Sequence, residues 1–196
     1  RLGWYIVLAT IPAGLAGLLL ESYISTIARS VHVIAYTTIG FGLLLGLASY
    51  LNRKMNWHTV VNLTHSRPDS LKQLSLSQAI IIGLAQAIAL IPGTSRSGIT
   101  LTAGLFLGLR PEAAARFSFL LSIPIIIASA LLEGYKLVVY EPQGANPIEM
   151  LIGITISFIT ALIVISMFMR YISKSGMAIF VIYRILLGAA LLYFIS

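Results

Sequence analysis

Apolar residues occur along this chain in long, nearly uninterrupted runs, separated by short polar connections. The runs lack both the alternation of a half-buried strand and the polar stripe of a water-facing helix, and their length is typical of helices that cross a bilayer. The long runs predict membrane spans at residues 4–20, 31–51, 113–132, 148–169 and 177–195. Between them we expect a short polar turn at 21–29 and a polar loop at 52–77.

Two shorter apolar stretches, residues 78–91 and 99–109, flank a polar segment. Helices of about 11–14 residues reach only about 16–21 Å, whereas the hydrocarbon core is about 30 Å thick. The connections before and after this region are both basic, which favours placing them on the same side of the membrane. We therefore predict a re-entrant helix–loop–helix over about 78–109. The alternative is two thin full spans with the polar segment at the outer surface.

Composition supports an integral membrane protein. Hydrophobic residues make up 58% of the chain and charged residues only 10%, against about 25% in a soluble domain. The predicted fold class is an all-α, polytopic membrane helical bundle, with residues 1–196 forming a single transmembrane domain. Cysteine is absent from the sequence, which excludes disulfides and a thiolate nucleophile. The net charge of +7 is spread over short connections, so we expect a membrane partner and no nucleic acid.

The charges of the connections also predict an orientation. Basic residues dominate the 52–77 loop and the connections near residues 110–116 and 170–174, whereas residues 133–149 hold three glutamates and one lysine. Because positive connections stay in the cytoplasm, the acidic connection and the C-terminus are expected outside.

The polar segment is Pro92-Gly-Thr-Ser-Arg-Ser-Gly98. An arginine inside the membrane costs at least about 2.5–3.5 kcal/mol, so Arg96 is expected to have a ligand or partner. Pro92 should end the first half-helix, Gly93 can adopt the left-handed conformation, and Ser95 or Ser97 can cap the second half-helix. The free amides of that helix form an anion site, and a guanidinium fork matches phosphate oxygens. The segment therefore indicates a phosphate ligand, with a plain polar turn as the alternative.

The segment lies within Gln86-Ala-Ile-Ala-Leu-Ile-Pro-Gly-Thr-Ser-Arg-Ser-Gly-Ile-Thr100, followed by Ala114-Ala-Arg-Phe-Ser-Phe-Leu-Leu-Ser-Ile-Pro124. These residues, with residues 9–17 and 180–184, resemble the bacterial undecaprenyl-diphosphatase family, which is linked to bacitracin resistance. The resemblance runs the whole length of the chain. It implies hydrolysis of undecaprenyl diphosphate to the monophosphate and phosphate, which recycles the lipid carrier for peptidoglycan synthesis. It also implies an inverted-repeat fold with re-entrant hairpins, in the bacterial plasma membrane, with the active site facing the outer side.

The resemblance also implies roles for individual residues. Arg96 matches the principal phosphate clamp, and it is the one catalytic residue expected here. The remaining matches are substrate-binding, namely Gly93, Thr94, Ser95, Ser97, Gly98 and Thr100. Members of the family depend on a divalent cation, usually taken as magnesium or calcium.

The family's Glu-x-x-x-Glu and Ser-Ser-x-Gly-His segments do not occur in this chain. We expect them, with the metal ligands and the reacting group, upstream of Arg1, so that the chain is the C-terminal two-thirds of the family fold. No metal ligand is therefore assigned here.

Other interpretations stay open or are excluded. A broken-helix transporter or lipid flippase that binds an anionic substrate would use the same segment. The lipid phosphatases that pair a Ser-Arg motif with a downstream His-x-x-x-Asp are excluded, because no histidine follows His65. Arg116 and Arg184 are interpreted as reaching the headgroups or pairing within the bundle rather than binding substrate. The sequence leaves the oligomeric state open, a homodimer included.

Overall fold

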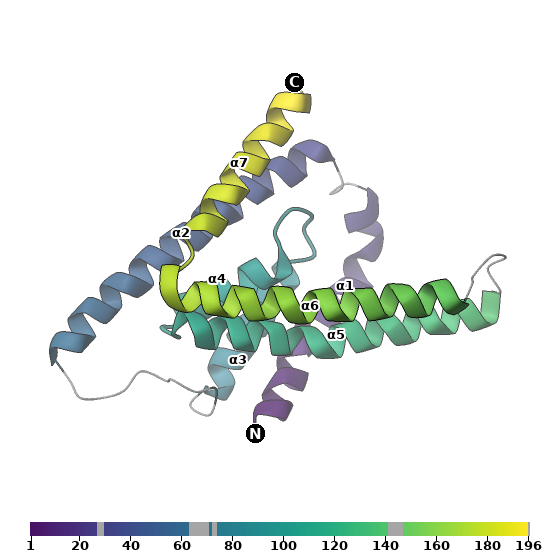
Figure 1. The fold of residues 1–196 in the computed structure, drawn as a ribbon, viewed down its shortest axis with the longest axis horizontal. Helices are drawn as coiled ribbons and strands as arrows, with labels where there is room; N and C mark the ends of the chain where they lie inside the picture. Colours follow the sequence, from purple (N-terminus) through teal and green to yellow (C-terminus); the bar gives the residue numbers. More distant parts are fainter. Residues whose placement is uncertain (27–29, 63–70, 72–73, 141–146, 196) are drawn as a thin grey trace.

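The computed structural model describes all residues except 27–29, 63–70, 72–73, 141–146 and 196. The described residues form α-helices and no strand, which confirms the predicted fold class (Figure 1). The helices follow the chain in this order: α1 (Leu2–Thr26), α2 (Val31–Asn62), α3 (Leu76–Ile88), α4 (Arg96–Phe106), α5 (Pro111–Tyr140), α6 (Pro147–Ser175) and α7 (Ala178–Ile195).

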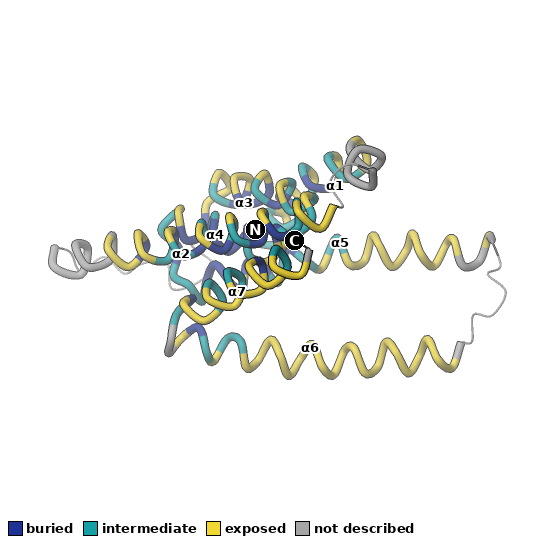
Figure 2. The backbone as a smooth tube through the Cα atoms, turned by 90° about the horizontal axis from the view of Figure 1, so that it is seen from above, coloured by how far each residue is buried: buried dark blue, intermediate teal, exposed yellow. Residues whose placement is uncertain are grey.

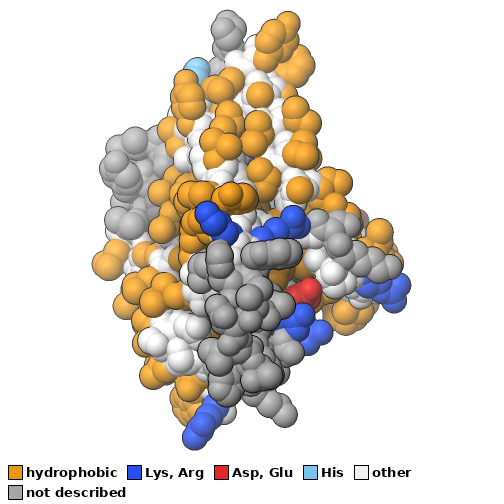
Figure 3. All heavy atoms as spheres, turned by 90° about the vertical axis from the view of Figure 1, so that its left-hand side faces the viewer, with side chains coloured by type: hydrophobic (Ala, Val, Ile, Leu, Met, Phe, Trp, Pro, Cys, Tyr) orange, Lys and Arg blue, Asp and Glu red, His pale blue; other side chains and the backbone are white. Residues whose placement is uncertain are grey.

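Four helices in the described part of the chain are long and apolar enough to cross a membrane: α1, α2, α5 and α6. The run predicted at 177–195 corresponds to α7, a helix of 18 residues. A helix of that length measures about 27 Å, slightly less than the hydrocarbon core. Hydrophobic side chains cover much of the face drawn in Figure 3, and basic side chains gather below them. This surface is the kind that lipid tails solvate.

The predicted polar connections were too long. Helix α1 continues to Thr26, beyond the end expected at residue 20, and α2 continues to Asn62, through the first part of the expected 52–77 loop. Residues 21–26 and 52–62 contain neither glycine nor proline, and the Arg53 and Lys54 side chains favour helix. Polarity in these segments marks the expected membrane edge rather than the end of the helix.

Helices α3 and α4 form the predicted helix–loop–helix. A capping box starts α3, where Ser75 accepts a hydrogen bond from the Gln78 amide and the Gln78 side chain accepts one from the Ser75 amide. Gly83 of α3 lies directly against the Ala9 backbone of α1, and a methyl group there would collide with it. Such close contact joins the short helix pair to a long helix, and most of the buried residues in Figure 2 lie in this region.

Helix α7 packs along α2, as Figure 1 shows, and this contact places the C-terminal helix beside the loop between α3 and α4. Gly188 makes the contact close, since a side chain there would collide with Ile39. The second half of α5 and most of α6 instead extend away from the bundle and are exposed (Figure 2). None of the residues in the most apolar 18-residue stretch of α6 is buried, whereas Ile172 near its C-terminal end belongs to the core.

Candidate anion-binding site

The loop between α3 and α4 turns sharply through two residues with positive φ. Gly93 has φ 86°, and Ser95 has φ 66°, which makes Ser95 the one non-glycine residue with positive φ in the described chain. The Ser95 hydroxyl accepts a hydrogen bond from the Gly98 amide at 3.3 Å and caps α4. The predictions of a left-handed Gly93 and a capping Ser95 are confirmed. A non-glycine residue held in this conformation is typical of functional loops.

Helix α2 holds the loop from one side. The Thr37 hydroxyl donates to the Pro92 carbonyl at 2.6 Å, and the Thr38 hydroxyl donates to the Gly93 carbonyl at 3.2 Å. A side chain at Gly93 would collide with the Thr37 hydroxyl and the Ile34 carbonyl. Glycine is therefore required here by both space and backbone conformation.

Arg96 is half-buried and bonded inside the bundle. Its Nε and Nη2 donate to the Gln86 side-chain oxygen at 3.1 and 3.0 Å, and Nη2 also donates to the Leu121 carbonyl at 2.6 Å. The expectation that Arg96 has a partner is confirmed, and the partners found are protein groups on α3 and α5. Its Nη1 has no acceptor among the described residues. Its role as a phosphate clamp stays a prediction.

Arg184 of α7 is bonded to the other side of the loop. Its Nη2 donates to the Gly93 and Thr94 carbonyls at 2.8 and 2.9 Å, and its Nε donates to the Thr38 carbonyl at 3.3 Å. The interpretation that this arginine pairs within the bundle is confirmed. Because it binds the carbonyls of the loop itself, it also becomes part of the candidate site, which the sequence interpretation had not foreseen.

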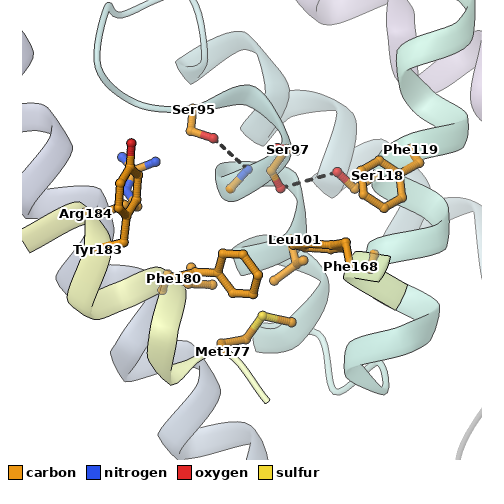
Figure 4. A pocket seen from close by; sticks show the side chains of 13 residues that line it. Ser95, Ser97, Leu101, Ser118, Phe119, Phe168, Met177, Phe180, Tyr183 and Arg184 are labelled. Carbon is orange, nitrogen blue, oxygen red and sulfur yellow. Dashed lines mark hydrogen bonds between the residues drawn. The ribbon is translucent and has the colours of Figure 1, made fainter. Parts of the chain in front are cut away.

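A cavity of about 180 Å³ lies beside the N-terminus of α4 (Figure 4). Its polar lining consists of Ser95, Ser97, Gly98, Ser118, Tyr183 and Arg184; its apolar lining consists of Leu45, Leu101, Ala115, Phe119, Phe168, Met177 and Phe180. Figure 4 shows Ser95 and Arg184 at one end and Met177 at the other. A polar end and an apolar wall suit a ligand that is itself amphipathic.

The predicted site residues divide into two groups. Ser95, Ser97 and Gly98 line the cavity, whereas Gly93, Thr94, Arg96 and Thr100 do not. The Thr94 side chain is 0% exposed, and its hydroxyl has no partner among the described residues. The substrate-binding roles of the residues in both groups, and the catalytic role of Arg96, stay predictions.

Thr100 is buried, and its hydroxyl is shared with the protein. It forms a hydrogen bond of 2.7 Å with the Ser118 hydroxyl, and it also donates to the Arg96 and Ser97 carbonyls. Sequence reasoning missed Ser118 and Arg184 as cavity residues. Both lie in segments that carry the family resemblance, Ser118 within 114–124 and Arg184 within 180–184, and this was the available signal.

The electrostatics of the cavity favour an anion. The Arg96 and Ser97 amides at the start of α4 have no acceptor among the described residues, and the helix dipole adds positive potential there. Arg184 contributes a full positive charge. No carboxylate or imidazole is among the cavity's lining residues.

This donor set does not fit a divalent cation, which prefers carboxylate and carbonyl oxygens. Within the described residues, no group of three or more His, Cys, Asp or Glu side chains is placed to hold a metal ion. The cation implied by the resemblance would need other ligands, and no step is derived through it.

Fold and site together define a class: a polytopic α-helical membrane protein in which two short helices are joined by a sharp loop and the second starts beside an amphipathic cavity. The chain belongs to the family of bacitracin resistance protein BacA, whose family model matches residues 1–190. It is 48% identical over its full length to an undecaprenyl-diphosphatase from Alteromonas mediterranea, covering 68% of that protein. It is 51% identical over 97% of its length to one from Saccharophagus degradans, covering 66% of that protein. The chain thus spans about two thirds of the length of these relatives.

Proposed function

We propose that this chain carries the phosphate-binding half of an undecaprenyl-diphosphatase. The reaction is hydrolysis of undecaprenyl diphosphate to undecaprenyl phosphate and inorganic phosphate. The observation that carries the proposal is the cavity at the start of α4, where a cationic, hydroxyl-rich end adjoins an aromatic wall. The relatives named undecaprenyl-diphosphatase support this reaction over the binding-only activity of a transporter.

Substrate binding follows from the chemistry of the cavity. The diphosphate lies at the α4 N-terminus, where the Ser97 amide and the Ser95 and Ser97 hydroxyls donate to its oxygens. Arg96 supplies a positive charge through Nη1, while Gln86 and Leu121 hold its other nitrogens. The isoprenoid chain extends along Phe168 and its aromatic neighbours towards lipid.

Hydrolysis adds water to the terminal phosphorus and breaks the anhydride P–O bond. Undecaprenyl phosphate leaves with the bridging oxygen, and the proton of the attacking water is released. In phosphoryl transfer the main catalytic contribution is positioning and stabilisation of charge on the phosphoryl oxygens. Fixed amides and guanidinium groups in a poorly hydrated cavity provide that contribution.

The membrane placement is part of the proposal. Basic connections on the cytoplasmic side of a bacterial plasma membrane would leave the acidic 133–149 region outside. In that orientation α3 and α4 enter and leave from the cytoplasmic side, and the loop at Gly93 opens towards the outer side.

The test is release of inorganic phosphate by the purified full-length protein from a polyprenyl diphosphate in detergent. Arg96→Ala should nearly abolish turnover, with Arg170→Ala on the exposed end of α6 as the control. Activity of Arg96→Ala within a few-fold of wild type would refute the clamp role. Binding of the lipid without any phosphate release by the wild-type protein would refute the phosphatase and favour a transporter.

A further inference from the structure

Arg184 has more hydrogen-bond donors than its partners in the bundle use. A guanidinium carries five N–H groups, of which Nε and Nη2 account for three. These nitrogens donate to the carbonyls of Thr38, Gly93 and Thr94. The two N–H groups of Nη1 have no acceptor among the described residues.

The free edge of Arg184 faces the start of α4. A methyl group built on Gly98 would stand 3.5 Å from Arg184 Nη1 and 3.1 Å from the Ser95 hydroxyl oxygen. Arg184, Gly98 and Ser95 all line the cavity, and Figure 4 shows the Arg184 side chain at its polar end, to one side of Ser95. Nη1 is therefore adjacent to the position where the α4 amides would bind an anion.

The cavity wall opposite the polar end is aromatic. The Phe168 ring centroid lies 5.4 Å from that of Phe119 and 4.9 Å from that of Phe180, so residues from α5, α6 and α7 form one apolar surface. Such walls exclude water and strengthen the attraction between a guanidinium and an anion. A ligand that fills both ends has an anionic head and an apolar tail.

We infer that Arg184 is a second substrate-binding cation, which holds the loop with Nε and Nη2 and binds a lipid phosphate oxygen with Nη1. This rests on the proposed function and adds a residue to its site. Arg96 is the first residue of α4 and bonds to α3 and α5, whereas Arg184 reaches the loop from α7, so the two guanidiniums are held by different sets of helices. The two cations divide the negative charge of a diphosphate between them.

The experiment compares binding of farnesyl diphosphate, a short polyprenyl diphosphate, to full-length wild type, Arg184→Gln and Arg184→Lys. We expect Arg184→Gln to weaken binding at least about tenfold, because it removes the charge and the fork. Arg184→Lys should fall between the two, because it keeps the charge but loses the fork. The control is Arg116→Gln, an exposed arginine on α5 that does not line this cavity, and it should bind within about twofold of wild type.

A purely structural role for Arg184 would lower thermal stability in both variants and leave the affinity of the folded fraction unchanged, and that result would overturn the inference. Should Arg184→Gln fail to fold, Gly98→Ala decides, since its methyl group occupies the space beside Nη1 while leaving the Arg184 bonds in place. Wild-type affinity in Gly98→Ala would then refute the inference. This experiment measures binding and not turnover. The proposed reaction is tested independently, and it would be refuted if the wild-type protein showed no phosphatase activity.

Discussion

The side-chain oxygen of Gln86 accepts two hydrogen bonds from Arg96, one from Nε at 3.1 Å and one from Nη2 at 3.0 Å. Gln86 is only 2% exposed and lies on α3, so the first half-helix fixes the plane of a guanidinium that belongs to the second. The Leu121 carbonyl of α5 fixes the same group at 2.6 Å. Together they use Nε and Nη2 of Arg96, and Nη1 has no acceptor among the described residues.

Replacing Gln86 should therefore alter catalysis without touching the substrate directly. Gln86→Leu leaves two donors of Arg96 without their acceptor and frees the guanidinium to rotate, so we expect kcat/KM for phosphate release to fall at least about tenfold. Gln86→Glu keeps both hydrogen bonds but neutralises the charge, so KM should rise more than kcat falls. Steady-state kinetics separate the two variants. Equal kinetic constants for Gln86→Leu and wild type would show that Arg96 needs no support from α3.

Gly93 should tolerate no side chain. Its φ of 86° costs about 1–2 kcal/mol for an L residue, and the added methyl group would collide with Thr37 and Ile34. We expect Gly93→Ala to lower the thermal unfolding temperature by several degrees in detergent. The control is Gly153→Ala on α6, where nothing lies within 4 Å of an added methyl group and stability should be unchanged or slightly higher. An unchanged unfolding temperature for Gly93→Ala would mean that the loop accommodates the methyl group without loss of stability.

Thr100 is expected to matter more for stability than for substrate affinity, because its hydroxyl is buried against Ser118. Thr100→Val should destabilise the protein by about 1–3 kcal/mol, since it leaves Ser118 with one fewer partner. In the double variant Thr100→Val/Ser118→Ala, the loss of unfolding free energy should be smaller than the sum of the losses in the two single variants, because both single substitutions remove the same hydrogen bond. Denaturation of the wild type, the two single variants and the double variant measures this coupling. If Thr100→Val were as stable as wild type but bound farnesyl diphosphate more weakly, the Thr100 hydroxyl would have a role in substrate binding instead.

The sequence predicted the helix–loop–helix because its signals are local. Pro92 and Gly93 interrupt two short apolar stretches, and Ser95 stands where a capping residue is needed. The ends of α1 and α2 were placed wrongly, because polar residues without glycine or proline extend a helix past the apolar run.

The position of Arg184 could not be predicted in the same way. Its contact with the Gly93 carbonyl depends on α7 packing along α2, which brings together residues far apart in the chain. For the same reason the pairing of Arg96 with Leu121 could not be foreseen: the sequence indicated that a partner was needed but not which carbonyl would provide it.

The aromatic wall of the cavity should contribute affinity only for ligands with a tail. Phe168 lies between Phe119 and Phe180, and its truncation removes ring contacts without altering the polar end. Phe168→Ala is expected to weaken farnesyl diphosphate binding about tenfold while leaving the affinity for inorganic diphosphate within about twofold.

The matched control is Phe158→Ala, since Phe158 is on the same helix, is 63% exposed and does not line the cavity. For each variant, competition binding gives the fold loss of affinity for farnesyl diphosphate and for inorganic diphosphate, and the first is divided by the second. A ratio near one for Phe168→Ala would mean that the isoprenoid chain leaves the site by another path. A ratio near ten for Phe168→Ala, with a ratio near one for Phe158→Ala, would assign the first isoprene units to the cavity between α5, α6 and α7.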